Sequence, residues 1–210
     1  MRPYRVKTPS FLQRIFPKRV WRLPNNKKEV YLTFDDGPIP EVTPWVLDTL
    51  KKHQAKGTFF CIGDNAVKHP DVFQRILSEG HSVGNHTFNH LNGWKTPTRE
   101  YVENTVKAEE TLQLKKSKLF RPPYGKIRVE QSKALRNLGY HIIMWDVLSA
   151  DFDPSVSKEL CFQNVCDHMK PGSIVVFHDS LKAEERLRHA LPKVLEHIDK
   201  EGWNCNKIAF

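Results

Sequence analysis

Cysteine is scarce in this sequence, and the spacing of the four that occur excludes the common cysteine-built sites. Cys61, Cys161, Cys166 and Cys205 match neither a CxxC pair nor a zinc-finger spacing. We therefore expect free thiols in a reducing compartment. Neither GxGxxG nor GxxxxGK[ST] occurs, which argues against a nucleotide site, and no stretch approaches the roughly 20 apolar residues of a membrane span.

The first 24 residues contain no acidic residue, although they are rich in Arg and Lys. They lack the apolar core of a signal peptide, so the expected location is the cytoplasm. We expect residues 1–28 to form a basic extension that packs on the domain. The alternative is that "SFLQRIF" forms a short amphipathic turn, which would give weak contact with a membrane surface.

The net charge of +9, from 33 Lys+Arg against 24 Asp+Glu, favours acidic partners such as nucleic acid, anionic glycans or a membrane surface. Because basic residues are spread along much of the chain, a solvated basic surface is favoured over a dedicated anion site. We expect no nucleic-acid partner, and the oligomeric state stays open. A length of 210 residues is enough for one domain with a sizeable core.

Short apolar runs alternate with longer segments of helical period, which is the pattern of βαβ units. The expected strands are 29–34, 57–62, 81–85, 118–121, 140–145, 173–178 and the terminal "NKIAF". We predict a single α/β domain over residues 29–210, built on parallel strands as an open sheet or a barrel. Both architectures place ligands at the carboxyl ends of their strands.

Polar residues follow five of the expected strands at their carboxyl ends, and we expect these residues to meet at one site. They are Asp35 and Asp36, His86 and His90, Arg121, Asp146, and His178. The spacing of His86 and His90 places both imidazoles on one face of a helical turn. With one carboxylate they make a ligand set for zinc or a similar divalent metal, with a position open for water.

Hydrolysis at such a metal also needs a base and an acid. The second aspartate of the Asp35–Asp36 pair is a candidate base. His178, which comes from another strand, is a candidate acid. The spacing does not say which aspartate binds the metal.

From Val30 to Gly202 the chain resembles the polysaccharide deacetylases of carbohydrate esterase family 4, which share the NodB homology domain. Five motifs occur in the order of the family: "TFDDG" (33–37), "HTFNH" (86–90), "RPPYG" (121–125), "WDVLSADF" (145–152) and "VFH" (176–178). The resemblance implies a distorted (β/α) barrel of about seven strands. It also implies metal-dependent removal of acetyl groups from N-acetylated sugars.

The resemblance assigns roles within the Asp pair and to the residues of the third motif. Asp35 becomes the catalytic base, while Asp36, His86 and His90 hold one divalent metal, zinc first, with cobalt, nickel or manganese as alternatives. Arg121 keeps Asp35 ionised. Two prolines stiffen the turn, so that the Tyr124 N–H faces the substrate oxygen.

In the remaining motifs, the resemblance makes His178 the acid that protonates the departing amine, and makes Asp146 a carboxylate that orients Arg121 or His178. Two positions depart from the family pattern: Phe152 stands where Trp is usual, and Val176 stands where Leu is common. Both belong to the expected acetyl pocket, along with Tyr124 and Trp94. These changes bear on substrate preference rather than on the reaction.

The predicted function is deacetylation of a glycan that contains N-acetylglucosamine, with release of acetate. One alternative is a metal-dependent amidase acting on a small non-sugar amide, such as a ureide or cyclic imide. Another is a glycan-binding module that has lost catalysis. Chitin oligomers, peptidoglycan and a lipid-linked or surface polysaccharide all remain open as the glycan.

Overall fold

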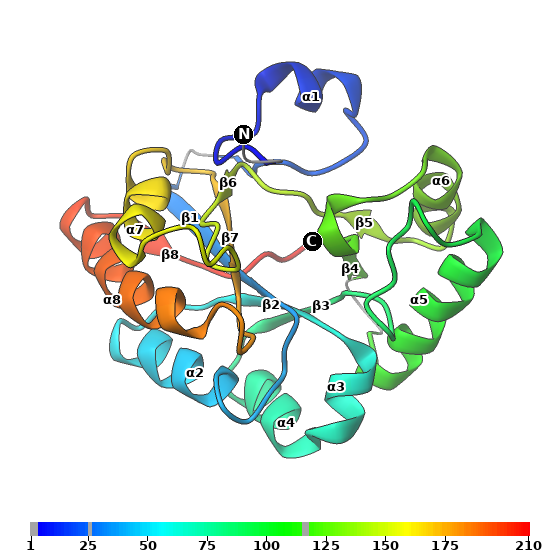
Figure 1. Ribbon diagram of the computed structural model, residues 1–210, viewed down its shortest axis with the longest axis horizontal. Helices are drawn as coiled ribbons and strands as arrows, with labels where there is room; N and C mark the ends of the chain where they lie inside the picture. Colours follow the sequence, from blue (N-terminus) through cyan, green and yellow to red (C-terminus); the bar gives the residue numbers. More distant parts are fainter. Residues whose placement is uncertain (1–3, 25–26, 115–117) are drawn as a thin grey trace.

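Eight parallel strands form the framework of the computed structural model, which describes residues 4–24, 27–114 and 118–210 (Figure 1). The strands are β1 (Glu29–Asp35), β2 (Thr58–Cys61), β3 (Ser82–Asn85), β4 (Leu119–Phe120), β5 (His141–Ile142), β6 (Val147–Leu148), β7 (Ile174–His178) and β8 (Asn204–Cys205). Seven of them pair in the order β5-β4-β3-β2-β1-β7-β6, and β8 pairs with β1 beside this path.

The connection between β5 and β6 shows why the sheet curls. These strands lie at opposite ends of the pairing path, yet only residues 143–146 separate them in the chain. Such a connection spans at most about 17 Å when extended. A flat sheet of seven strands would be about 29 Å wide. The sheet must therefore curl until its ends nearly meet, which confirms the predicted distorted (β/α) barrel of about seven strands.

Two strand predictions differ from the structure. The expected strand 140–145 ends at Ile142, and the short β6, which was not expected, pairs with β7 from Val147 onward. The terminal "NKIAF" is not a strand, because the backbone of Ile208 bonds to the hydroxyls of Thr58 and Ser82 instead of to a neighbouring strand. Strands of two residues depend on their partners, so no local run predicts them.

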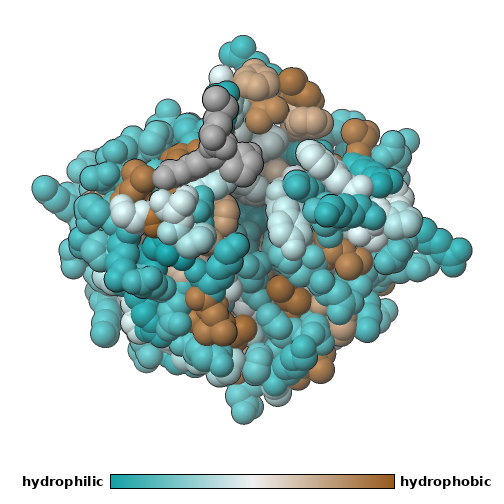
Figure 2. Space-filling view, viewed as in Figure 1, coloured by the Kyte–Doolittle hydropathy of each residue, from teal (hydrophilic) through white to brown (hydrophobic). Residues whose placement is uncertain are grey.

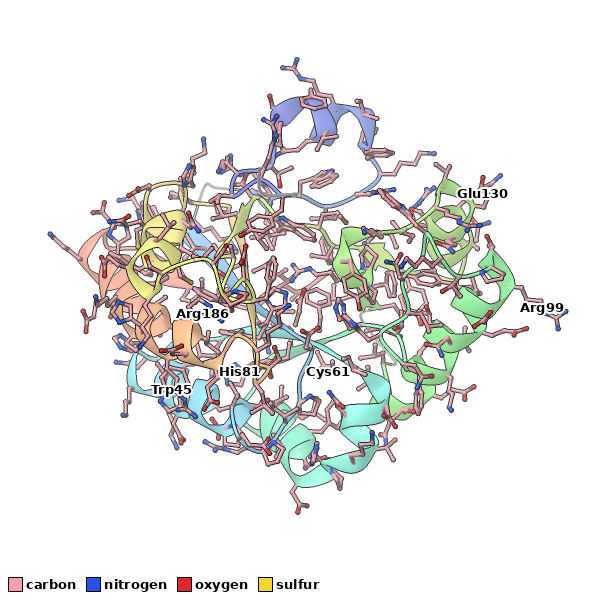
Figure 3. All side chains as sticks on the ribbon, viewed as in Figure 1. Trp45, Cys61, His81, Arg99, Glu130 and Arg186 are labelled. Carbon is pink, nitrogen blue, oxygen red and sulfur yellow. The ribbon has the colours of Figure 1, made fainter. Side chains whose placement is uncertain are left out.

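Helices cover the outside of the barrel and pack against the strands, except the first, α1, which projects from the N-terminal end and has no buried residue (Figures 1 and 3). They are α1 (Ser10–Ile15), α2 (Thr43–Lys52), α3 (Gly63–Lys68), α4 (Pro70–Ser78), α5 (Thr98–Leu112), α6 (Val129–Asn137), α7 (Lys158–Cys166) and α8 (Glu184–Lys200), with a 3₁₀ turn at Pro123–Gly125. In α8, Leu187, Leu191, Val194 and Ile198 recur at helical spacing and are buried. None of the described helices combines the length and apolarity needed to cross a bilayer.

The N-terminal segment, which we define as residues 4–24, lies along the seam between β5 and β6. Val20 exchanges backbone hydrogen bonds with the chain beside β5: its N–H donates to the Ile142 carbonyl at 2.8 Å, and its carbonyl accepts from Met144 at 2.7 Å. On the other side, Lys7 forms an antiparallel bridge with Val147 of β6. The segment thus supplies backbone partners to both end strands. The division of the chain into an extension (1–28) and a domain (29–210) stays a prediction.

Candidate active site

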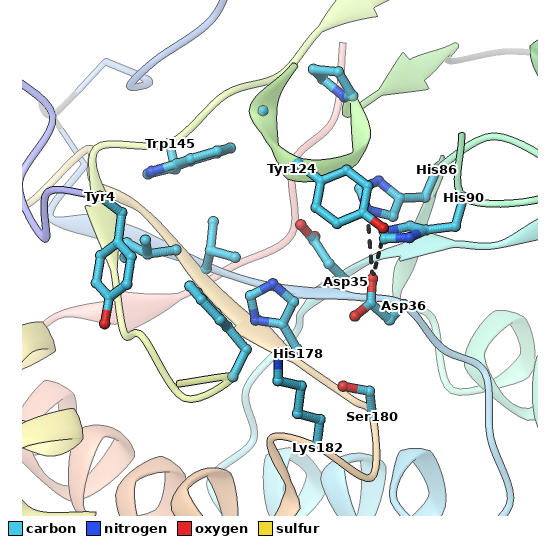
Figure 4. A pocket seen from close by; sticks show the side chains of 15 residues that line it. Tyr4, Asp35, Asp36, His86, His90, Tyr124, Trp145, His178, Ser180 and Lys182 are labelled. Carbon is cyan, nitrogen blue, oxygen red and sulfur yellow. Dashed lines mark ion pairs between the residues drawn. The ribbon is translucent and has the colours of Figure 1, made fainter. Parts of the chain in front are cut away.

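Three candidate metal ligands converge at the carboxyl ends of β1 and β3 (Figure 4). Asp36 Oδ1 lies 3.2 Å from His90 Nε2 and 3.7 Å from His86 Nε2. One ligand atom from each residue lies within 4.8 Å of the others. The site therefore brings together the Asp and the two His that the sequence pattern predicts as metal ligands.

The loop that carries the two histidines is irregular, not the helical turn that the HxxxH spacing suggested. Thr87 and His90 have positive φ angles of 64° and 55°, which a right-handed helix does not allow. The loop keeps this shape because Asn85 Oδ1 accepts the Thr87 N–H at 2.8 Å and Thr87 Oγ1 accepts the Leu91 N–H at 3.0 Å. Side chains hold the conformation, as is common where strained backbone forms a site.

The chemistry of the donor set fits a divalent metal. His86 Nδ1 donates to the Arg121 carbonyl at 2.8 Å, so the lone pair of the neutral ring lies on Nε2, which faces Asp36. Burial lowers the pKa of His86 to about 4, which favours this neutral form. Burial alone would raise the pKa of Asp36, but the hydrogen bond with His90 and the charges of nearby histidines hold it below its ordinary value.

The buried side chain of Asp179 shapes the turn that carries Asp36. Asp36 itself has a φ of +83°. Gly37 N–H donates to Asp179 Oδ1 at 3.0 Å, and a Cβ on Gly37 would lie only 2.0 Å from Asp179 Oδ2. Thr43 Oγ1 donates to the same carboxylate at 2.6 Å. Burial raises the pKa of Asp179 to about 8. Glycine at position 37 is thus required by this close approach.

Asp35 is buried and bonded to Arg121. Arg121 Nη1 donates to Asp35 Oδ1 at 2.7 Å and to Thr33 Oγ1 at 2.6 Å, while Nη2 donates to the Met144 carbonyl at 3.0 Å. The guanidinium is fully buried and lies over the ring of Phe60 at 4.1 Å. Because both partners are fixed from several sides, the Asp35 carboxylate has one position at the mouth of the barrel.

His178 occupies the position beside Asp35 in the sheet. The register of β1 and β7 pairs Asp35 with His178, so both side chains leave neighbouring strands at the same level and on the same face. Figure 4 shows Asp35, Asp36 and His178 reaching toward one space.

Asp151 holds His178 from behind. His178 Nδ1 donates to Asp151 Oδ1 at 2.8 Å, and the His178 N–H donates to Asp151 Oδ2 at 2.7 Å. Burial alone lowers the pKa of His178, but the charge and hydrogen bond of Asp151, with the charges of Asp36 and Asp35, raise it to about 9. The imidazole is thus arranged to carry a proton with its Nε2 toward the site.

The contact predicted for Asp146 is wrong. Its Oδ2 accepts from Lys7 Nζ at 2.7 Å and from Ser173 Oγ at 2.7 Å, and lies 3.4 Å from Arg22 Nε, so Asp146 joins the N-terminal segment to the barrel. The carboxylate that contacts His178 is Asp151, which the sequence analysis did not assign to this role. Two sequence features could have indicated this role for Asp151: it belongs to the "WDVLSADF" motif, and it directly precedes Phe152, which was predicted to line the pocket.

A pocket of 520 Å³ opens in front of these groups. Of the predicted pocket residues, Phe152, Val176 and Tyr124 line it, whereas Trp94 lies outside it and lines the adjoining groove. Tyr124 is exposed, has a φ of +61°, and places its ring 4.7 Å from that of His90. The lining residues that the sequence analysis missed include Tyr4, Trp145, Leu148, Ser180 and Lys182.

Comparison with known proteins gives three consistent findings. The family model for polysaccharide deacetylase matches residues 22–143. A peptidoglycan-N-acetylglucosamine deacetylase of Bacillus cereus is 42% identical over 183 residues, which cover 85% of this chain and 66% of that protein. A chitooligosaccharide deacetylase of Azorhizobium caulinodans is 32% identical over 168 residues, which cover 78% of this chain and 80% of that protein.

Among solved structures, a peptidoglycan N-acetylglucosamine deacetylase in complex with 4-naphthalen-1-yl-N-oxidanyl-benzamide superposes with a TM-score of 0.86. It is 37% identical, and the match covers 94% of this chain and 93% of that one. Fold, site and relatives together define a hydrolase of the carbohydrate N-deacetylase class. The chain belongs to the polysaccharide deacetylase family, carbohydrate esterase family 4, and its resemblance to that family is confirmed.

Proposed function

We propose that this protein removes acetyl groups from a glycan containing N-acetylglucosamine, using one divalent metal held by Asp36, His86 and His90. The observation that carries the proposal is the placement of Asp35 and His178 side by side in the sheet, both facing the Asp36–His86–His90 cluster across one pocket. Relatives named for peptidoglycan and for chitooligosaccharide support a sugar substrate, and no comparison supports the small-amide alternative.

The metal, zinc by its ligand set of two His and one carboxylate, supplies Lewis-acid activation of water and of the amide carbonyl. The chain's own residues move the protons. Asp35, which accepts the Arg121 hydrogen bond through Oδ1, takes the proton from the attacking water. The carbonyl carbon gains the C–O bond, and the developing oxyanion is stabilised by the Tyr124 N–H, an effect worth about 3–4 kcal/mol for a well-placed donor.

His178 completes the reaction as the acid. Its imidazolium, oriented by Asp151, gives the Nε2 proton to the departing amine as the C–N bond breaks. Acetate and a free amino sugar leave. Asp35, bonded to Arg121, and His178, bonded to Asp151, thus supply the base and the acid without a further residue.

Acetate release from the metal-loaded protein tests this proposal, using N-acetylglucosamine oligomers, peptidoglycan fragments and simple sugar amides. We expect Asp35→Asn and His178→Ala to reduce turnover by more than 100-fold, since general acid–base groups contribute about 10²–10⁴. Asp71→Asn, an exposed acid at the start of α4, is the matched control and should retain full activity.

Metal analysis separates the roles of the two groups of residues. Asp35→Asn and His178→Ala should keep their metal after dialysis, whereas His86→Ala and Asp36→Ala should lose it. A protein that releases no acetate from any of these substrates is not a sugar deacetylase. A glycan-binding module without catalysis would then be the better description.

A further inference from the structure

A second hollow, which we call the N-terminal groove, lies next to the active-site pocket and shares five lining residues with it. It measures 670 Å³. Tyr4, Tyr124, Gly125, Trp145 and Leu148 line both the pocket and the groove. A glycan that extends from the pocket past these shared residues would place its neighbouring sugars in the groove.

The N-terminal segment forms one wall of this groove, and the loop from Tyr124 to Val129 forms the other. Figure 2 shows the apolar side chains of α1 gathered at the top of the molecule, above a mostly hydrophilic surface. Inside the groove, Trp21, Trp94 and Trp145 contribute indole rings. Flat aromatic faces of this kind pack against the apolar faces of sugar rings.

The charges in the groove have one sign. Four cations line it, Arg5, Arg19, Lys126 and Arg128, and none of its lining residues is acidic. None of the four forms an ion pair within the described ranges 4–24, 27–114 and 118–210. Three of the four contact ring faces or carbonyls: Arg19 lies over Phe16, Lys126 lies over Trp94, and Arg128 donates to the Trp94 carbonyl at 2.7 Å.

One groove cation, Arg19, is partly buried, forms no ion pair in the described ranges, and also lines a neighbouring pocket together with Arg136. Burial and the charge of Arg136 lower the pKa of Arg19. Arg136 Nε is itself buried and has no hydrogen-bond partner in the described structure. Like charges brought together in this way are relieved by an anion from outside.

We propose that the N-terminal groove binds the part of the glycan next to the reacting sugar, and that it selects glycans carrying anionic groups, carboxylate or phosphate. The inference rests on the proposed function and narrows its substrate class, because a neutral chitin oligomer carries no negative charge to pair with the four cations. It adds one specific anion site to the solvated basic surface that the sequence predicts. The N-terminal segment becomes part of the substrate-binding surface.

Two charge-removing variants test the proposal. Arg5→Gln/Lys126→Gln removes two groove cations, and Lys51→Gln/Lys52→Gln removes two exposed lysines in the last turn of α2 as the matched control. Deacetylation is measured on three oligomers of equal length: neutral N-acetylglucosamine, one with lactyl carboxylates on alternate sugars, and one with sugar phosphates. The two charged substrates show whether carboxylate or phosphate is preferred.

We expect wild type to favour at least one charged oligomer over the neutral one. Arg5→Gln/Lys126→Gln should reduce kcat/KM for that charged oligomer about tenfold, at about 0.7 kcal/mol for each cation. Its kcat/KM for the neutral oligomer should change less than twofold, and the control should match wild type throughout. The preference should also weaken as ionic strength rises. Equal losses on neutral and charged oligomers, or equal losses in the control, would overturn the proposal.

Tryptophan fluorescence gives a readout that does not depend on turnover. Three of the five Trp residues line the groove, so a bound glycan should change the emission. In an Asp35→Asn background, the charged oligomer should bind more tightly than the neutral one, and Arg5→Gln/Lys126→Gln should remove that difference. If acetate is released from charged and neutral oligomers at the same rate with the same affinity, the groove proposal fails while the deacetylase proposal stands. If no acetate appears from any oligomer, the fluorescence titrations alone still show whether the groove prefers charged glycans.

Discussion

The hydrogen bond between Asp151 and His178 makes a quantitative prediction about pH. Asp151→Asn keeps an oxygen for the His178 backbone N–H but replaces a charged acceptor at Nδ1 with an amide. A charge-assisted hydrogen bond is worth about 1.5–3 kcal/mol, and one pKa unit corresponds to 1.36 kcal/mol. The pKa of His178, raised to about 9 in the wild type, should therefore fall by about 1–2 units in the variant.

The sign of the effect follows from the role of His178 as the acid. Its protonated form is the active one, so activity is lost as pH rises through its pKa. The alkaline limb of the kcat profile should move to lower pH in Asp151→Asn, with a loss of about two- to tenfold at pH 8 and a smaller loss at pH 6.5. Both proteins carry the same metal, so the difference between them reports on Asp151.

Asp146→Asn is the matched control, since it changes another buried acid of the same motif. It should lower stability by releasing Lys7 and Arg22, yet leave the pH profile of kcat unchanged. An unchanged alkaline limb in Asp151→Asn, or the same shift in Asp146→Asn, would refute the assignment of Asp151 to His178. Thermal melting and metal content of both variants exclude unfolding as the cause.

Two further predictions concern positions away from the catalytic pair. Burial lowers the pKa of His81 to about 4 in the folded protein, where its Nδ1 accepts the Gly57 N–H. The unfolded chain binds the proton below about pH 6.5, and the folded protein binds it only near pH 4. The free energy of unfolding should therefore be highest above about pH 6.5 and fall by up to about 3 kcal/mol as the pH falls through 4. His81→Gln should flatten that loss in urea titrations at pH 7 and pH 4.5, and an unchanged slope would contradict it. At Gly125, with a φ of +67°, an added Cβ would lie 2.6 Å from Trp145, so Gly125→Ala should displace this ring and lower kcat/KM about fivefold, at about 1 kcal/mol. Gly202→Ala has a similar φ of +65° but open space around the Cβ, so it should lower the melting temperature and leave kcat/KM unchanged.

Much of the site was predictable because its residues follow strands. Asp35, Asp36 and His178 stand at the ends of apolar runs whose burial and parallel pairing the sequence predicts, so their convergence followed from topology. Asp151 was not found, because it lies in an irregular loop. Its contact with His178 depends on a backbone path that includes Ala150 at a φ of 60°, and no spacing rule describes such a path.

The strands at the seam escaped prediction for a related reason. β6 has two residues, and its strand geometry comes from pairing with β7 and with the N-terminal segment, which the local sequence does not encode. Trp94 was predicted to line the pocket as an aromatic residue that could stack on a sugar, yet it lines the adjoining groove. Which of two adjoining cavities a side chain lines is set by loop conformation rather than by the order of motifs.

The seam between β5 and β6 has a consequence for the order in which this protein can fold. Lys7 and its carboxylate partner Asp146 are separated by 139 positions, so the N-terminal segment cannot dock until most of the barrel that follows it in the chain has been synthesised. Contacts of such long sequence separation form late and slowly. Until they form, the unpaired edges of β5 and β6 are open to other strands, and aggregation would compete with folding at that stage. A variant that lacks the first 24 residues would leave the edges of β5 and β6 unpaired permanently, and it would stay prone to aggregation even with every catalytic group in place.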